Sequence, residues 1–87
     1  MYLIYFTDEA IANQERLAIA SSVQERITKK ISWLAENFAQ INPLPLSANL
    51  VGLFKLRVGD YRVIYAVDDD LKVITIYQIG HRREIYD

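Results

Sequence analysis

The last eight residues, 80–87, carry side chains that could do chemistry on a phosphate. His81 can exchange a proton near neutral pH, Arg82 can hold an anion, and Tyr86 can do either. They follow an apolar run over residues 71–79 that is typical of a β-strand. A small domain that places such groups just past a strand is better suited to handling a phosphate than to filling a core.

Three further cations, Lys55, Arg57 and Arg62, lie on predicted strands in the C-terminal half. Side chains alternate between the two faces of a strand, so Lys55 and Arg57 share a face, while Phe54 and Leu56 take the other. If this apolar pair packs against helices, the cations are turned outward. Arg62 would join them from the next strand, because antiparallel neighbours lie about 5 Å apart. Arg82 and Tyr86 would then lie beside these three cations.

The elements that must position these groups begin with an aromatic, β-branched segment, residues 2–6, which predicts a strand. A helix to about residue 20 follows, capped by Thr7 or Asp8. A second helix ends before the prolines at 43 and 45, which cannot continue it. We expect the two helices to form an antiparallel hairpin. The second helix carries an apolar stripe at helical spacing, made of Val23, Ile27, Ile31, Leu34 and Phe38.

The rest of the chain predicts an antiparallel meander, with strands over residues 50–57, 61–67 and 71–79 and turns at 58–60 and 68–70. The first strand should join this sheet, since alone it could not satisfy its backbone hydrogen bonds. The expected fold class is α+β, a helix hairpin packed on a curved antiparallel sheet of about four strands, in the order β-α-α-β-β-β. With 87 residues, we expect one domain over residues 1–87.

Composition excludes several classes of site. The chain has no cysteine, which removes disulfides, thiolate zinc sites and cysteine nucleophiles. One histidine and no dense carboxylate cluster argue against a metal, and we expect no cofactor. No apolar run is long enough to cross a bilayer and the N-terminus is unlike a signal peptide, so we expect a cytoplasmic protein. The net charge of −1 means that the chain as a whole is not basic, and it leaves room for a local basic surface in the C-terminal half.

The segment GLFKLRVGDYRVIY, residues 52–65, followed by IGHRREIY, residues 79–86, resembles the RelE branch of the RelE/ParE toxin superfamily. The signature is a K-L-R strand, a turn, Y-R-hydrophobic-hydrophobic-Y and a terminal G-[KH]-R with a tyrosine near the end. The resemblance implies the toxin of a toxin–antitoxin pair, which cleaves mRNA in the ribosomal A site and inhibits translation. The implied partners are a cognate antitoxin, in a hetero-oligomer, and the ribosome with its mRNA, with no membrane involved.

The resemblance also implies the chemistry, which is a metal-free attack of the RNA 2′-OH on the adjacent phosphorus to give a 2′,3′-cyclic phosphate. By this resemblance, Arg62 and Arg82 would contact the scissile phosphate, and Tyr86 would act as general base or orient the RNA. His81 stands where many relatives carry lysine, and whether His81 or Tyr86 is the general base stays open. The implied catalytic residues are Lys55, Arg62, His81, Arg82 and Tyr86, and the implied RNA or ribosome contacts are Arg57 and Arg83.

One departure and several alternatives accompany this interpretation. The best-known RelE toxin has a second lysine where this chain has Leu53, so one candidate cation is missing. The strand cations could be ordinary solvent-face residues, and Arg62 could form a surface ion pair. At the level of function, a ParE-like toxin that poisons gyrase and a decayed module that only binds antitoxin are the alternatives. We interpret Trp33, one position off the helical stripe, as a core-edge residue or as part of a partner surface, and favour the core edge.

Overall fold

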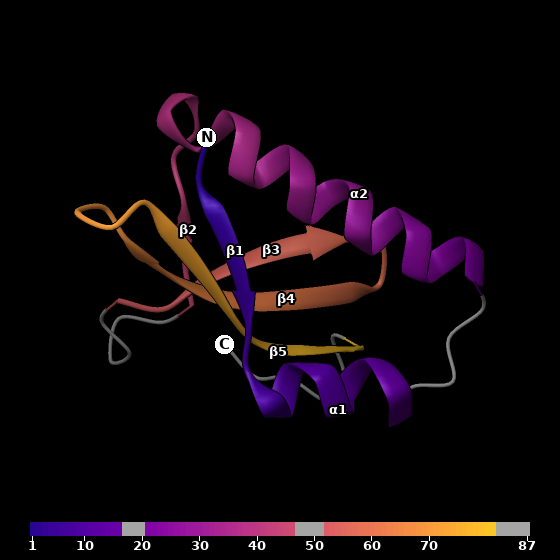
Figure 1. Ribbon diagram of the computed structural model, residues 1–87. Helices are drawn as coiled ribbons and strands as arrows, with labels where there is room; N and C mark the ends of the chain where they lie inside the picture. The colour runs from indigo at the N-terminus through magenta and orange to yellow at the C-terminus, as the bar shows by residue number, and fades with distance from the viewer. Residues whose placement is uncertain (17–20, 47–51, 82–87) are drawn as a thin grey trace.

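The computed structural model describes residues 1–16, 21–46 and 52–81 (Figure 1). Within these ranges the chain forms two α-helices, one short 3-10 helix and a five-stranded sheet. The elements are β1 (Leu3–Phe6), α1 (Asp8–Arg16), α2 (Ser21–Asn37), η1 (Phe38–Gln40), β2 (Leu44–Pro45), β3 (Phe54–Val58), β4 (Tyr61–Asp68) and β5 (Val73–His81). The α+β fold class is confirmed, with the helices packed on the sheet.

The sheet has the strand order β1-β5-β4-β3-β2. Its centre is the predicted meander, since β3, β4 and β5 pair antiparallel in sequence. Two details differ from the prediction. β1 pairs parallel to β5, so the sheet is mixed, because the chain reaches β5 only after crossing over through the helices. β2 adds a fifth, two-residue strand antiparallel to β3, in a segment whose prolines conceal it from sequence patterns.

The start of α1 is fixed by Thr7, one of the two predicted caps. The Ala10 backbone N–H donates to Thr7 Oγ1 at 3.1 Å, which satisfies an amide that the first helical turn leaves open. Asp8 and Glu9 follow in the first turn, where negative charge favours the helix dipole. The Thr7 backbone N–H donates to the Ile76 carbonyl at 3.0 Å, so the cap also ties α1 to β5.

The core lies between α2 and the sheet. The predicted stripe is confirmed at its centre, where Ile27, Ile31 and Leu34 are at most 3% exposed. The aromatic ring of Phe38 packs edge-on against Tyr2, with ring centroids 5.0 Å apart, and against Tyr65 at 6.5 Å. The sheet contributes the other buried apolar side chains, which include Val58, Val63, Tyr65, Ile74, Ile76 and Ile79.

The two helices contact different strands. α1 packs against β5 and β1, whereas α2 packs against β3, and they run in roughly opposite directions (Figure 1). β1 pairs with β5 only as far as Ile76, and α1 covers the edge beyond it. There the Ile79 backbone N–H donates to the buried Asn13 Oδ1 at 3.0 Å, and Gln78 donates to Glu9 at 3.1 Å. The side chains of α1 therefore satisfy an edge that a strand leaves open.

The turns shift the predicted boundaries. Gly59 adopts a φ of 60° in the β3–β4 turn, which suits glycine because it has no Cβ. In the β4–β5 turn, the Leu71 backbone N–H donates to Asp68 Oδ1 at 3.0 Å, and Lys72 has a φ of 57°. The last strand therefore begins at Val73, not at residue 71, and it runs on to His81. In the described part of the chain, no helix has the length and apolar character that a membrane span requires.

Burial raises the pKa of Tyr65 to about 12, and its side chain is 1% exposed. Well below pH 10 this tyrosine is protonated in both the folded and the unfolded chain. Between pH 10 and 12 the unfolded chain releases the proton and the folded chain keeps it, so stability falls as pH rises. The loss is at most about 2–3 kcal/mol. We expect Tyr65→Phe to reduce this decline.

The measurement is the free energy of unfolding in urea at pH 9 and pH 11.5 for the parent, Tyr65→Phe and Tyr77→Phe. Tyr77 is 41% exposed and serves as the matched control for loss of one tyrosine hydroxyl. An alkaline decline of the same size in the Tyr65 variant and the parent would contradict the assignment.

Candidate functional site

The meander brings three predicted site residues to one face of the sheet. Arg57 of β3 lies directly across from Arg62 of β4 in the antiparallel register. Residues so paired share a face and have Cα atoms about 4.5–5.5 Å apart. Lys55 is two residues before Arg57 on the same strand, so it takes that face as well. We call Lys55, Arg57 and Arg62 the cation row.

The cation row lies on the face opposite the α2 core. Leu56 and Val63, which alternate with its members, pair with each other and pack toward the helix side. Arg57 is exposed, whereas Lys55 and Arg62 are half-buried. The Nε atom of Arg62 is buried, which holds the base of its guanidinium close to the sheet. On β5, the residue across from Arg62 is Gly80, so no side chain stands beside the arginine at that position.

The structure does not bring His81 to the cation row. His81 is the last residue of β5 and lies across from Tyr61, with ring centroids 5.5 Å apart in an edge-on arrangement. Since side chains alternate, this register puts His81 on the face of Tyr61 and Val58, opposite to Arg62.

The other predicted site residues, Arg82, Arg83 and Tyr86, lie outside the described residues. Leu53, at the position where the best-known RelE toxin has lysine, comes just before β3 and is half-buried. Its carbonyl accepts a hydrogen bond from the Leu46 backbone N–H at 2.9 Å. The described part of the site therefore consists of two arginines and one lysine.

The two arginines and the lysine of the cation row can bind an anion and stabilise its negative charge. Arginine stays protonated and presents several N–H donors that match phosphate oxygens, and lysine adds a compact charge. Donors fixed in advance around a developing negative charge lower the barrier to phosphoryl chemistry. Among the residues that the structure describes, no group of three or more His, Cys, Asp or Glu side chains is placed to hold a metal ion.

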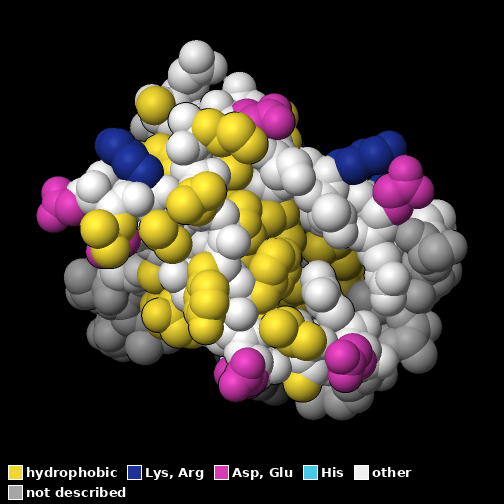
Figure 2. Space-filling view, viewed as in Figure 1, with side chains coloured by type: hydrophobic (Ala, Val, Ile, Leu, Met, Phe, Trp, Pro, Cys, Tyr) yellow, Lys and Arg dark blue, Asp and Glu magenta, His cyan; other side chains and the backbone are white. Residues whose placement is uncertain are grey.

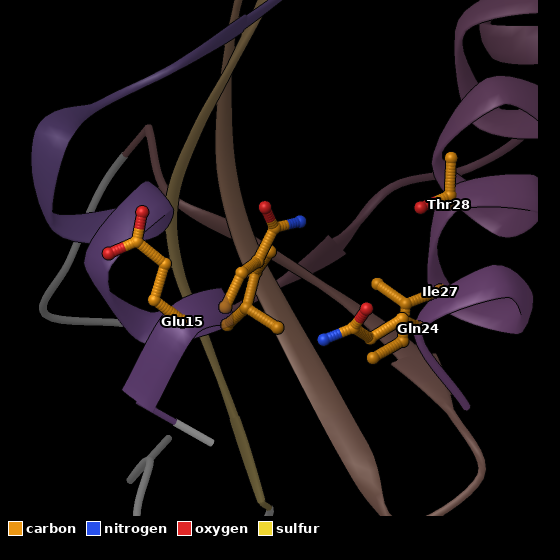
Figure 3. A pocket seen from close by; sticks show the side chains of 6 residues that line it. Glu15, Gln24, Ile27 and Thr28 are labelled. Carbon is orange, nitrogen blue, oxygen red and sulfur yellow. The ribbon is translucent and has the colours of Figure 1, made fainter. Parts of the chain in front are cut away.

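The helix side of the molecule carries a hollow between α1 and α2, which we call the interhelix groove. Its volume is about 290 Å³. Glu15 projects from α1, and Gln24, Ile27 and Thr28 project from α2 (Figure 3). Ile79 of β5 also lines it, and apolar side chains gather over this part of the face (Figure 2). Among the described residues that line it, Glu15 is a carboxylate and none is a cation, so the groove does not suit a phosphate, and Ile27 and Ile79 offer apolar contacts.

A second hollow, which the sequence analysis did not predict, lies between α2 and the β3–β4 turn. Its volume is about 480 Å³. Trp33 lines it and is 40% exposed, which favours the partner-surface alternative for this residue. The signal that could have revealed this surface is the helical spacing of Arg26, Lys29, Lys30 and Trp33. The full lining is Arg26, Lys29, Lys30, Trp33, Arg57, Val58 and Gly59.

Comparisons with known proteins place this arrangement among toxins. Residues 4–86 match the family model described as ParE toxin of type II toxin–antitoxin system, parDE. The toxin RelE of Mycobacterium tuberculosis is 45% identical, in a match that covers 79% of each chain. The toxin RelG of the same organism is 40% identical over 42 residues, and there the chain spans only about half of the relative, 48%.

Solved structures agree in fold. The RelBE2 toxin–antitoxin complex of Mycobacterium tuberculosis matches with a TM-score of 0.78 at 24% identity, covering 93% of this chain and 91% of that one. A double arginine-to-alanine mutant of Escherichia coli RelE, solved with a peptide of its antitoxin RelB, matches with a TM-score of 0.72 at 26% identity. That match covers 92% of this chain and 82% of the mutant.

Proposed function

Since this chain belongs to the ParE toxin family of type II toxin–antitoxin systems and matches RelE toxins as its relatives, we propose that it is a ribosome-dependent mRNA endonuclease. It would cut mRNA in the ribosomal A site and so inhibit translation. The one domain that carries this activity would span residues 1–87 and act in the cytoplasm, where ribosomes and mRNA meet.

The observation that carries the proposal is the placement of Arg57 directly across from Arg62, with Lys55 on the same face. In the reaction, a bond forms between the RNA 2′ oxygen and phosphorus while the bond from phosphorus to the 5′ oxygen breaks. The 2′ proton passes to a base, and the leaving 5′ oxygen gains a proton. The cation row would stabilise the negative charge that builds up on the phosphorane oxygens.

The described part of the site favours dependence on the ribosome. Its members are lysine and arginine, cationic groups that stabilise negative charge better than they accept a proton. Tyr86 and Arg82, assigned by the family resemblance, would supply the base and a further phosphate contact. With few proton acceptors, the rate depends strongly on how the 2′-OH is aligned, and the ribosome would provide that alignment.

A cognate antitoxin is the second proposed partner. The RelE mutant that is 26% identical to this chain was solved with a peptide of its antitoxin, which supports a hetero-oligomer here as well. The interhelix groove, with Ile27 and Ile79 in its lining, offers apolar contacts for such a segment. An acidic stretch of the same antitoxin would mask the cation row and thereby block access to RNA.

The test is to induce the chain in a bacterium that carries a separately inducible antitoxin gene from the same operon, and to map mRNA 5′ ends on translating ribosomes. We expect new 5′-OH ends within A-site codons soon after induction, growth arrest, and recovery when the antitoxin is induced. Intact mRNA in arrested cells would overturn the proposal.

The name of the matching family model favours one alternative, a gyrase poison of the ParE type. The same experiment separates the two functions, because a gyrase poison would trigger the DNA damage response and leave mRNA intact. Induction without any effect on growth would instead identify a chain that only binds its antitoxin.

A further inference from the structure

The hollow between α2 and the β3–β4 turn, which we call the α2 groove, is strongly basic. Four of the seven residues that line it are cations, and none is a carboxylate. The chain as a whole carries a net charge of −1, with 10 basic and 11 acidic residues, so this concentration of one sign is local. A groove lined in this way attracts a polyanion. The four cations are Arg26, Lys29, Lys30 and Arg57.

The helix side of the groove is a single face of α2. Arg26, Lys29, Lys30 and Trp33 follow the spacing i, i+3, i+4 and i+7, which places them in one row along a helix. These α2 residues lie beside the buried stripe of the same helix. Packing of the stripe on the sheet therefore fixes the direction in which the α2 cations point. The groove is thus a product of the fold and not a chance meeting of long side chains.

Arg26 joins the two sides of the groove. A Cβ atom built on Gly59 would lie only 3.0 Å from Arg26 Nη2, so the guanidinium rests against the β3–β4 turn. Gly59 suits this position twice, because it adopts a φ of 60° and leaves room for the arginine. The contact places one cation against the β3–β4 turn, and Arg57 and Val58 at the end of β3 also line the groove.

Trp33 adds an aromatic surface to the charges. The Lys30 ammonium lies 4.1 Å from the centre of the indole ring, a cation–π contact that holds both groups at the surface. Lys29 pairs with Glu25 at 3.1 Å, but both side chains are at least 66% exposed. Exposed pairs of this kind contribute little and can be exchanged for another anion. A phosphate can therefore compete for Lys29.

The α2 groove adjoins β3, the strand that carries two members of the cation row, although the row itself lies on the opposite face of the sheet. An adjoining hollow is lined by Lys30, Trp33 and Arg57, which also line the groove, and by Lys55 of the cation row. Arg57 in turn lies directly across from Arg62. An RNA strand whose phosphates follow the α2 groove would thus pass the end of β3 and reach the cation row.

We propose that the α2 groove binds the sugar-phosphate backbone of RNA and leads it to the cation row, an inference that rests on the proposed nuclease function. Cations in a line with an exposed aromatic ring are the combination that holds single-stranded nucleic acid, since phosphates meet the charges and a base meets the ring. An acidic protein segment would satisfy the charges but would make less use of Trp33.

The chain supplies its own probe, because Trp33 is its only tryptophan. A 12-nucleotide RNA with 2′-O-methyl groups cannot be cut by 2′-OH attack and reports binding alone. In the folded parent chain we expect it to change Trp33 emission in a saturable way. We expect the affinity, measured by anisotropy of the labelled RNA, to fall steeply with salt.

The test variant is Arg26→Gln/Lys29→Gln/Lys30→Gln. We expect it to bind the RNA at least about 10-fold more weakly at low salt, and to lower the slope of log K against log salt by about 2. Lys72→Gln is the matched control, since this exposed lysine lies in the turn at the other end of β4, and it should bind like the parent. Lys29→Gln/Lys30→Gln, which leaves the Arg26 contact intact, should show a smaller loss even if the triple variant unfolds.

The outcomes separate this proposal from the function on which it rests. Failure of the parent to bind the RNA, or equal binding by the parent and both groove variants, overturns the α2 groove as an RNA site. Groove variants that lose affinity for the antitoxin and keep it for RNA overturn it in favour of an acidic protein. If binding depends on the groove but the parent cuts no mRNA on ribosomes, the groove stands and the nuclease proposal fails.

Discussion

Replacing Arg62 with alanine is expected to lower the rate of mRNA cleavage on ribosomes by about 10²- to 10³-fold. Arg62 belongs to the cation row and lies across from Arg57 on one side and Gly80 on the other. Its Nε is buried, so the base of the guanidinium lies close to the sheet, and its donors would act on the charge that develops on the RNA phosphate. Because such donors act on charge that develops during the reaction, the loss should appear in kcat more than in KM.

Two further variants isolate the cause of that loss. Arg62→Lys keeps the charge without the planar fork of donors and should recover only part of the activity. Lys72→Ala removes a cation from the exposed β4–β5 turn and should cleave at the parental rate. Single-turnover cleavage on programmed ribosomes measures all three, with antitoxin binding as the check on folding. Parental kcat in Arg62→Ala would remove the cation row from the proposed mechanism.

Strand alternation was enough to predict the cation row. Lys55 and Arg57 alternate with Phe54 and Leu56, and Arg62 alternates with Tyr61 and Val63 on the next strand. A period of two is imposed by the backbone itself, so each strand's charged face follows from its apolar face. The tight turn at Gly59 then fixes which residues meet, and it brings the two arginines together.

The position of His81 could not be predicted in the same way. The apolar run ends at residue 79 and predicted the end of the strand there, but β5 continues through Gly80 to His81 because β4 offers it Tyr61 as a partner. The pairing of β4 with β5 also shifts register between Ile64 and Tyr65. Such irregularities depend on how two strands fit together, and a single strand's sequence does not reveal them.

The α2 groove was missed because its two sides are distant in sequence. Arg26 lies on a helix and Gly59 in a hairpin turn, and only packing of α2 on the sheet brings them into contact. The whole-chain charge of −1 also concealed the basic surface beside α2. The parallel pairing of β1 with β5 was missed for a related reason, since strand direction at a sheet edge depends on the crossover and not on the strand.

The helix stripe, in contrast, leads to a large effect on stability. Leu34 is 0% exposed at the centre of the contact between α2 and the sheet. Leu34→Ala removes buried methyl groups and leaves a cavity, which costs about 2–5 kcal/mol. The stability expected of an 87-residue chain is about 4–13 kcal/mol. We therefore expect this variant to be marginally folded or unfolded at 37 °C.

The matched control is Leu71→Ala, the same change at a side chain that is 70% exposed in the β4–β5 turn. Its free energy of unfolding in urea should stay within about 0.5 kcal/mol of the parent. Leu34→Ala should also lose toxicity in cells through lower abundance, with its site residues unchanged. An antitoxin that binds only the folded chain would then raise its melting temperature, because binding shifts the folding equilibrium. Equal losses of stability in the two variants would contradict a core centred on Leu34.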